Sequence, residues 1–162
     1  MDEKELRLHR CCFTGHRPEK LQTEEHMIRA KLEHEIDAAI SDGFCTFISG
    51  MARGVDLWAA EIMLEKRREN SAIKLIAASP YRGFEERWSS DWRQMYCNVL
   101  NKADLVRYIC DGYSRACFQT RNEWMVNHSA RVIAVYNGEA GGTRNTIEYA
   151  NRIRVPVVTI RP

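Results

Sequence analysis

The sequence predicts a single α/β domain spanning residues 1–162, with a mostly parallel sheet and helices on both of its faces. Six short apolar runs, rich in Val, Ile, Cys and Phe, have the composition of strands buried on both faces. Helix-length segments separate these runs, and such alternation along a whole chain is typical of a doubly wound sheet with right-handed crossovers. Three of the runs lead into glycine loops just before a helix. This pattern indicates a ligand pocket at the carboxyl edge of the sheet.

The first strand is expected at Arg10–Thr14, and residues 1–9 before it are expected to form a flexible or edge segment. The clearest helix follows at Glu24–Ile40, where apolar residues recur on one face, and Gly43 supplies its C-terminal stop. The second strand is expected at Thr46–Ser49.

The next helix is expected at Val55–Arg68, where the apolar pattern repeats. It leads to a strand at Lys74–Ala78 and then to a helix at Phe84–Asn101. Within that helix, the four-residue spacing of Trp88 and Trp92 indicates a packing stripe, which favours a core or interface position for both rings. If the rings are exposed, this helix is a candidate surface for a homodimer.

The alternation continues to the C-terminus without a linker, a repeat or a low-complexity segment, so we expect one domain. The remaining strands are expected at Leu105–Ile109, Arg131–Tyr136 and Val157–Ile160, and the remaining helices at Cys117–His128 and Thr143–Arg152.

The composition argues against several functional classes. The formal net charge of +2 disfavours a general nucleic-acid binder, although residues 105–162 hold eight arginines and no lysine. No apolar run approaches the roughly 20 residues of a membrane helix, and the charged N-terminus lacks a secretory apolar core. Without a C-x-x-C pair or metal-type histidine spacing, neither a metal nor a cofactor is expected. We therefore expect a cytoplasmic protein with reduced cysteines.

The first glycine loop, Thr14-Gly15-His16-Arg17-Pro18, directly follows the first expected strand. In doubly wound folds this loop commonly contacts the ligand, and Thr14, His16 and Arg17 are candidate phosphate donors there. Gly15 allows the backbone to approach a ligand closely. The alternative is a surface turn stopped by Pro18, with His16 and Arg17 pointing into water.

The second glycine loop has two glycines four residues apart, directly before an amphipathic helix. It is not a Walker A loop, because no Gly-Lys-Ser/Thr follows, and it lacks the G-x-G spacing of the dinucleotide fingerprint. Its candidate ligand contacts are Ser49, Gly50, Arg53, Gly54 and Asp56. Asp56 is expected either to cap the helix or to bond a ribose hydroxyl.

Further candidate ligand contacts lie where other expected strands end or helices begin. They are Tyr81, Arg82, Asn122, Gly141, Gly142, Thr143 and Arg144. Aromatic and arginine side chains can stack on a ligand ring, and a glycine pair before a helix leaves N–H groups free to bind an anion.

Ser49-Gly50-x-Ala52-x-Gly54-x-Asp56 resembles the S-G-x-A-x-G-x-D signature of the SLOG superfamily, which includes the DNA-processing protein DprA. Thr14-Gly15-His16-Arg17-Pro18 narrows the resemblance to the YpsA-like branch, and the similarity covers nearly the whole chain. The resemblance implies a Rossmann-like domain with a pocket for a nucleotide-type ligand.

Within that superfamily the chain is also similar to the LOG-type phosphoribohydrolases. Arg121 and Met125 match an arginine four residues before a methionine, and Gly141-Gly142-Thr143 with Glu148 matches much of P-G-G-x-G-T-x-x-E. The matching arginine and glutamate are catalytic in that family, so the resemblance implies Arg121 and Glu148 as candidate catalytic residues. Arg144 replaces a glycine of the motif, where it either crowds the phosphate loop or supplies a new ligand contact.

Three functions follow from these observations. The first is a sensor or regulatory module that binds a small nucleotide or nucleotide-derived ligand. The second is a nucleoside-monophosphate phosphoribohydrolase. The third is DprA-like binding of single-stranded DNA, which the arginine bias of the C-terminal third supports and the near-neutral total charge opposes. We expect no membrane partner, and we expect nucleic acid to be a less favoured partner than a small nucleotide.

Overall fold

The chain folds around one six-stranded sheet in which every neighbouring pair of strands is parallel. The computed structural model describes residues 1–162. Its strands are β1 (Arg10–Gly15), β2 (Thr46–Ser49), β3 (Lys74–Ser79), β4 (Leu105–Tyr108), β5 (Arg131–Val135) and β6 (Val157–Ile160). Its helices are α1 (Glu3–Arg7), α2 (Glu25–Ser41), α3 (Val55–Glu69), α4 (Ser90–Lys102), α5 (Cys117–Asn127) and α6 (Gly142–Arg152), with a 3₁₀ turn at Pro18–Lys20. The predicted single α/β domain with a parallel sheet is confirmed.

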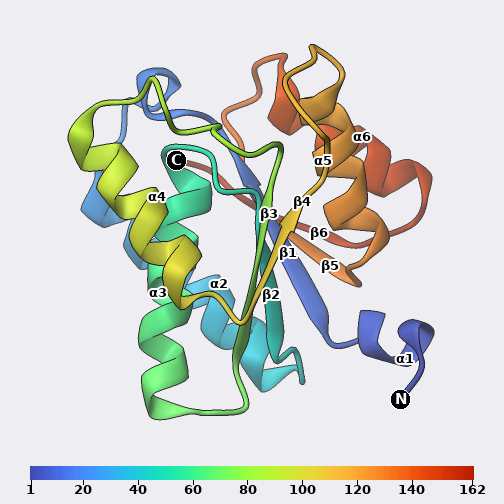
Figure 1. The fold of residues 1–162 in the computed structure, drawn as a ribbon. Helices are drawn as coiled ribbons and strands as arrows, with labels where there is room; N and C mark the ends of the chain where they lie inside the picture. The colour runs from blue at the N-terminus through green and yellow to red at the C-terminus, as the bar shows by residue number, and fades with distance from the viewer.

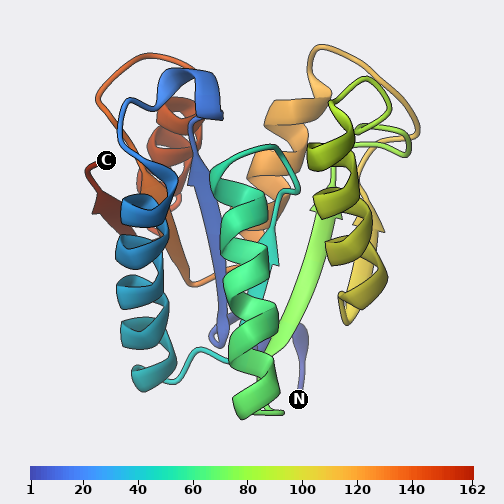
Figure 2. The ribbon, with the colours of Figure 1, turned by 90° about the vertical axis from the view of Figure 1, so that its left-hand side faces the viewer.

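Helices cover both faces of the sheet, as Figure 1 and Figure 2 show: α2, α3 and α4 lie on one face, and α5 and α6 on the other. Each face has its own core. Phe13 and Phe47 point into the larger core under α2–α4, whereas their strand neighbours Cys12 and Ile48 point into the smaller core under α5 and α6. Burial on both faces explains why the strands are continuous apolar runs rather than alternating ones.

The strand order is β4-β3-β2-β1-β5-β6, which places β1 in the interior of the sheet. The chain builds outward from β1 to β4 in one direction and then returns through α5 to add β5 and β6 on the other side of β1. The loops after β1 and β5 therefore leave the same edge and diverge to opposite faces. Such a switch point opens a crevice at the carboxyl edge of a parallel sheet.

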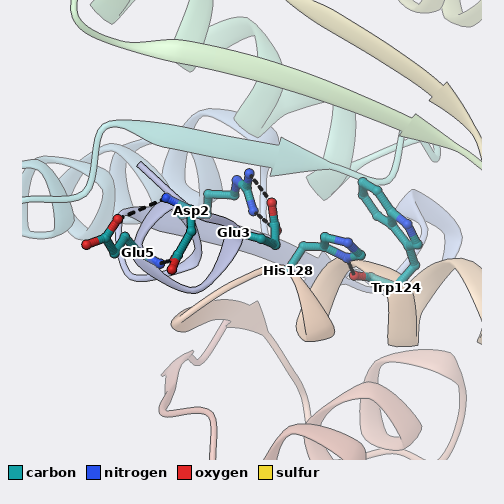
Figure 3. A network of polar contacts seen from close by, with 6 residues as sticks. Asp2, Glu3, Glu5, Trp124 and His128 are labelled. Carbon is teal, nitrogen blue, oxygen red and sulfur yellow. Dashed lines mark hydrogen bonds and ion pairs between the residues drawn. The ribbon is translucent and has the colours of Figure 1, made fainter.

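Two elements differ from the expected pattern. The N-terminal segment contains α1, which begins with a capping box between Asp2 and Glu5. Figure 3 shows this box together with Glu3, which pairs with Arg10 at 2.5 Å. The fourth helix begins at Ser90 rather than at Phe84, because residues 81–87 form turns with Gly83 at φ +87°.

The later start of α4 changes the setting of the two tryptophans. Trp88 precedes the helix and packs edge-on against Tyr96, with 5.6 Å between ring centroids, whereas Trp92 on α4 packs against Trp58 at 6.1 Å. Both rings are half-buried within the chain, so each leaves only part of its surface to the candidate homodimer surface. None of the helices combines the length and the apolar composition needed to cross a bilayer.

Candidate ligand-binding cleft

A cleft of about 350 Å³ opens at the carboxyl edge of the sheet, at the β1/β5 switch point. Ten of the residues singled out from the sequence line it: Thr14, Gly15, His16, Arg17, Arg53, Asp56, Arg121, Asn122, Gly142 and Thr143. The other lining residues are Lys20, Ala52, Phe84, Trp88 and Phe118. All three glycine loops thus contribute to one cavity, because parallel strands bring their carboxyl ends to the same edge.

The first two loops are in direct contact. A Cβ on Gly15 would lie 2.5 Å from Cβ of Val55, so the end of β1 touches the first residue of α3. Gly54, just before α3, has φ +91°, and a Cβ there would lie 2.9 Å from Cδ of Pro18. Neither position has room for a side chain. Because the first and second glycine loops touch in this way, they form one continuous wall of the cleft.

The Ser49 hydroxyl holds the second glycine loop in place through two hydrogen bonds to its backbone. The hydroxyl donates to the carbonyl of Asp56 at 2.8 Å and accepts from the N–H of Met51 at 3.2 Å. It therefore ties the start of the loop to the first turn of α3. This closure turns the Asp56 side chain toward the cleft, which it lines.

Asp56 and Arg121 form a buried charged centre in the cleft, with 6% and 5% of their surfaces exposed. Gly50 lies between them: its carbonyl accepts from Nη1 of Arg121, and a Cβ there would lie 2.8 Å from Oδ2 of Asp56. Oδ2 accepts weakly from Ala52 N–H at 3.3 Å, whereas Oδ1 has no hydrogen-bond partner. Burial raises the pKa of Asp56 to about 6, and the nearby Arg121 works against this rise.

Arg121 is fixed by several protein groups. Besides the Gly50 carbonyl, it donates from Nε to Oδ1 of Asn122 at 2.8 Å. Burial lowers the pKa of the guanidinium, whereas the Asp56 carboxylate raises it. The Asn122 amide nitrogen is left without a protein partner and lies 4.0 Å from the position of a Cβ on Gly142.

His16 is a neutral donor at the mouth of the first loop. Its Nε2 accepts from the Asn137 N–H at 3.2 Å, which leaves the ring proton on Nδ1, and its ring stacks on Tyr136 with 5.7 Å between centroids. Burial lowers the pKa of His16, and the charge of Lys20 lowers it further. The side chain is 4% exposed, so it supports the loop and offers one N–H to the cleft.

One end of the cleft concentrates positive charge, and we call it the anion end, made by Arg17, Lys20 and the first residues of α6. Arg17 and Lys20 form no ion pair, whereas Arg53 pairs with Glu19 at 2.5 Å. Nζ of Lys20 lies 3.5 Å from where a Cβ of Gly141 would be, directly at the start of α6. No side chain caps α6, and its second residue, Thr143, is 5% exposed with a hydroxyl that bonds no protein group.

The opposite side of the cleft is an aromatic wall made by Phe84, Trp88 and Phe118. Phe84 packs edge-on against Trp88 at 4.9 Å and lies 5.9 Å from Phe118, centroid to centroid. All three rings are half-buried, so each keeps part of its surface toward the cavity. The cleft therefore joins a cationic end, a buried carboxylate and an apolar wall.

The candidate catalytic pair is not brought together. Arg121 lines the cleft, but Glu148 does not; it lies on the outer side of α6, where its side chain is 63% exposed and pairs with Arg144 at 3.4 Å. The other candidate contacts also lie outside the lining. Tyr81 packs edge-on against Phe84 of the aromatic wall, Arg82 stacks over Tyr108 at 4.3 Å, and Gly50, Gly54 and Gly141 shape the loops without lining the cavity.

The chain matches the family model YpsA, described as the YspA SLOG family, over residues 11–154. The SPbeta prophage-derived protein YoqJ of Bacillus subtilis is 36% identical over 121 residues, which cover 65% of this chain and 69% of YoqJ. A UPF0398 protein of Staphylococcus aureus strain JH9 is 25% identical over 118 residues, covering 72% of this chain and 63% of that protein. The match thus spans less than two thirds of the staphylococcal relative.

Two solved structures share the fold. DprA from Streptococcus pneumoniae has a TM-score of 0.68 with 16% identity, covering 97% of this chain and 52% of DprA. The Helicobacter pylori protein, described for its single-stranded DNA binding mode, has a TM-score of 0.68 with 17% identity, covering 99% of this chain and 68% of that protein. The family match over most of the chain, together with the identity to YoqJ, shows that this chain belongs to the YspA SLOG family.

Proposed function

We propose that the cleft binds a nucleotide or nucleotide-derived ligand and that the protein acts as a sensor or regulatory module. The observation that carries this proposal is a set of four cleft-lining side chains that are each at most 8% exposed and each hold a polar atom without a protein partner. They are Thr14, Asp56, Asn122 and Thr143. Oδ1 of Asp56 is the one of these atoms that is itself buried, and buried polar atoms are almost always hydrogen-bonded, so this unpartnered acceptor beside three open polar atoms in one cavity favours a polar ligand.

The distribution of these groups supports the orientation of such a ligand. At the anion end, the N–H groups at the start of α6, the Thr143 hydroxyl and Lys20 are all donors suited to a phosphate. Oδ1 of Asp56 is an acceptor in a cleft otherwise rich in donors, and it suits a hydroxyl or an N–H of the ligand. The aromatic wall suits a flat ring.

Binding is expected to stabilise the protein. Thermal unfolding with the four ribonucleoside monophosphates and with ADP-ribose should reveal at least one that raises the melting temperature, since a ligand at 100 times its Kd adds about 2.7 kcal/mol to the free energy of unfolding.

Lys20→Ala should weaken the affinity for that ligand about tenfold, because it removes one charge-assisted contact at the anion end. Lys102→Ala, which alters an exposed lysine at the end of α4, is the matched control and should bind normally. A wild-type protein that none of these compounds stabilises would contradict the proposal.

The hydrolase is the second candidate function, and it rests on the resemblance that singles out Arg121 and Glu148. The outward position of Glu148 and its pairing with Arg144 favour binding over hydrolysis. We therefore expect wild-type protein to release no free base from a nucleoside monophosphate over hours, as measured by chromatography of the reaction mixture. Release of base by the wild type, abolished in Glu148→Ala with binding retained, would instead establish the hydrolase.

Binding of single-stranded DNA is the third candidate, and the fold shared with the Helicobacter pylori protein supports it. The cleft combines cations with aromatic rings, which is also how single strands are held. A gel-shift titration distinguishes this function from small-ligand binding, because strand binding depends steeply on salt. Retention of a labelled oligonucleotide at low salt, lost as salt rises, would favour it; no retention at any salt would exclude it.

A further inference from the structure

The aromatic wall of the cleft continues onto the protein surface. Tyr113, in the loop between β4 and α5, is 70% exposed, and its ring centroid lies 6.2 Å from Phe118 of the wall and 5.9 Å from Tyr81. Tyr81 in turn lies 5.6 Å from Phe84 of the wall. We call Tyr81 and Tyr113 the outer aromatic pair. Figure 2 shows the two loops that carry it side by side at the carboxyl edge of the sheet.

The wall and the outer pair form one continuous series of rings. From Trp88 through Phe84 and Phe118 to Tyr113, successive centroids are 4.9, 5.9 and 6.2 Å apart. A single nucleobase would occupy only the part of this series that lines the cleft, which ends at Phe118. A single nucleoside bound in the cleft would therefore leave the rings of Tyr81 and Tyr113 uncovered.

Tyr113 is held in a position from which it can stack. Its ring meets Tyr81 at an interplanar angle of 82° and Phe118 at 65°, so both contacts use ring edges and leave most of the tyrosine surface open to solvent. An exposed aromatic ring that is pinned on two sides loses little conformational freedom when a ligand ring stacks on it.

Two arginines beside the outer pair are available to a phosphate linker. Arg115 follows Tyr113 by two residues, Arg82 follows Tyr81, and both arginines are exposed without an ion pair. Arg82 lies flat on the ring of Tyr108, with its Cζ 4.3 Å from the centroid, which keeps the guanidinium at the same rim. The surrounding charges are mixed: Asp111 lies in the Tyr113 loop, and Glu86 and Arg87 both act on Tyr81.

We infer that the outer aromatic pair is a second ring-binding subsite, which stacks a further nucleobase joined through phosphate to the nucleotide in the cleft. This inference rests on the proposed function, because the first nucleotide anchors the second base. Two sources supply this chemistry: a free dinucleotide, and the end of a single-stranded nucleic acid.

The test compares ligands of increasing length on one protein. Each ribonucleoside monophosphate, the matching 5′-phosphorylated dinucleotide and the matching single-stranded 12-mer are titrated into wild type by calorimetry. The dinucleotide should bind about tenfold more tightly than the monophosphate, since stacking one base on an aromatic side chain is typically worth about five- to 150-fold in affinity. Tyr113→Ala should remove this advantage, whereas Tyr113→Phe, which keeps the ring, should preserve it. Leu8→Ala, which alters a 59% exposed apolar side chain preceding β1, is the matched control.

Each outcome decides the inference. Equal affinity of monophosphate and dinucleotide for wild type, or an advantage that survives Tyr113→Ala, would overturn the second subsite and leave the proposed function intact. No binding of any ligand would overturn both. An advantage that Tyr113→Ala removes supports the subsite; equal affinity of dinucleotide and 12-mer then identifies a free dinucleotide, and a further gain with the 12-mer identifies a single strand.

Discussion

Gly15→Ala is expected to lower the free energy of unfolding by about 3 kcal/mol, because overpacking a rigid core typically costs 1–3 kcal/mol and here three atoms are overlapped. The added methyl would lie 2.5 Å from Cβ and Cγ2 of Val55 and 2.7 Å from its Cγ1. Val55 is fully buried at the start of α3, so it has no room to withdraw. β1 and α3 must separate to admit the methyl group, which would also distort the cleft wall.

Urea denaturation of wild type and variant measures this loss. Gly112→Ala is the matched control, because a Cβ on Gly112 meets no atom within 4 Å and that glycine has no positive φ. Adding Val55→Gly to Gly15→Ala removes all three overlapped atoms, so the double variant should lose less stability than the two single losses added together. A loss for Gly15→Ala as small as that of the control would show that the two loops are not in rigid contact.

Asp56→Asn is expected to stabilise the protein at pH 7 by up to about 3 kcal/mol while weakening ligand binding. Burial raises the pKa of Asp56 to about 6 from an ordinary value of 3.8. Because the folded state holds the proton more tightly than the unfolded state, the contribution of Asp56 to stability is complete below pH 4 and is lost as pH rises through 6. Asparagine keeps the shape and an acceptor for Ala52 but has no charge to desolvate.

The measurement is urea denaturation of both proteins between pH 3.5 and 7.5. The two stabilities should coincide at the acid end and diverge as pH rises through 6, with the variant the more stable. Asp111→Asn changes an exposed carboxyl group, so its free energy of unfolding should follow the same pH dependence as that of the wild type. In the same variant set, only Asp56→Asn should reduce nucleotide affinity. Parallel curves for Asp56→Asn and wild type would show that the carboxylate is well solvated in the folded protein.

The fold was predictable because its determinants are local. The strands are short and mostly apolar, and each glycine loop is followed by a helix, so Thr46–Ser49 and Val157–Ile160 were predicted with their observed bounds. The strand order was not predictable, because it depends on which strands pair across the sheet. The start of α4 was misplaced because Phe84 and Trp88 are four residues apart, as on one face of a helix. In the structure they lie in the turns before α4, where Phe84 packs against the distant Phe118.

The lining of the candidate site was predictable where a motif fixes the backbone, and not where a side chain comes from a distant part of the chain. Thr14, Asp56 and Thr143 were singled out because they follow strands or begin helices. Lys20 had no signal in the sequence; it reaches Gly141 only because the 3₁₀ turn folds over the start of α6. Glu148 matched a motif by spacing, but spacing does not fix direction, and its side chain turns outward to Arg144.

The bare start of α6 has a consequence for the proposed binding of a phosphate. Without a side-chain cap, the first turn of this helix keeps free N–H groups, and such turns open and close easily. A phosphate at that turn would serve as the missing cap and slow its opening. The chain continues from α6 into β6, the edge strand of the sheet. A phosphate bound at α6 would therefore reduce the motion of this edge without changing its shape. A partner could then distinguish the loaded protein from the empty one by rigidity alone.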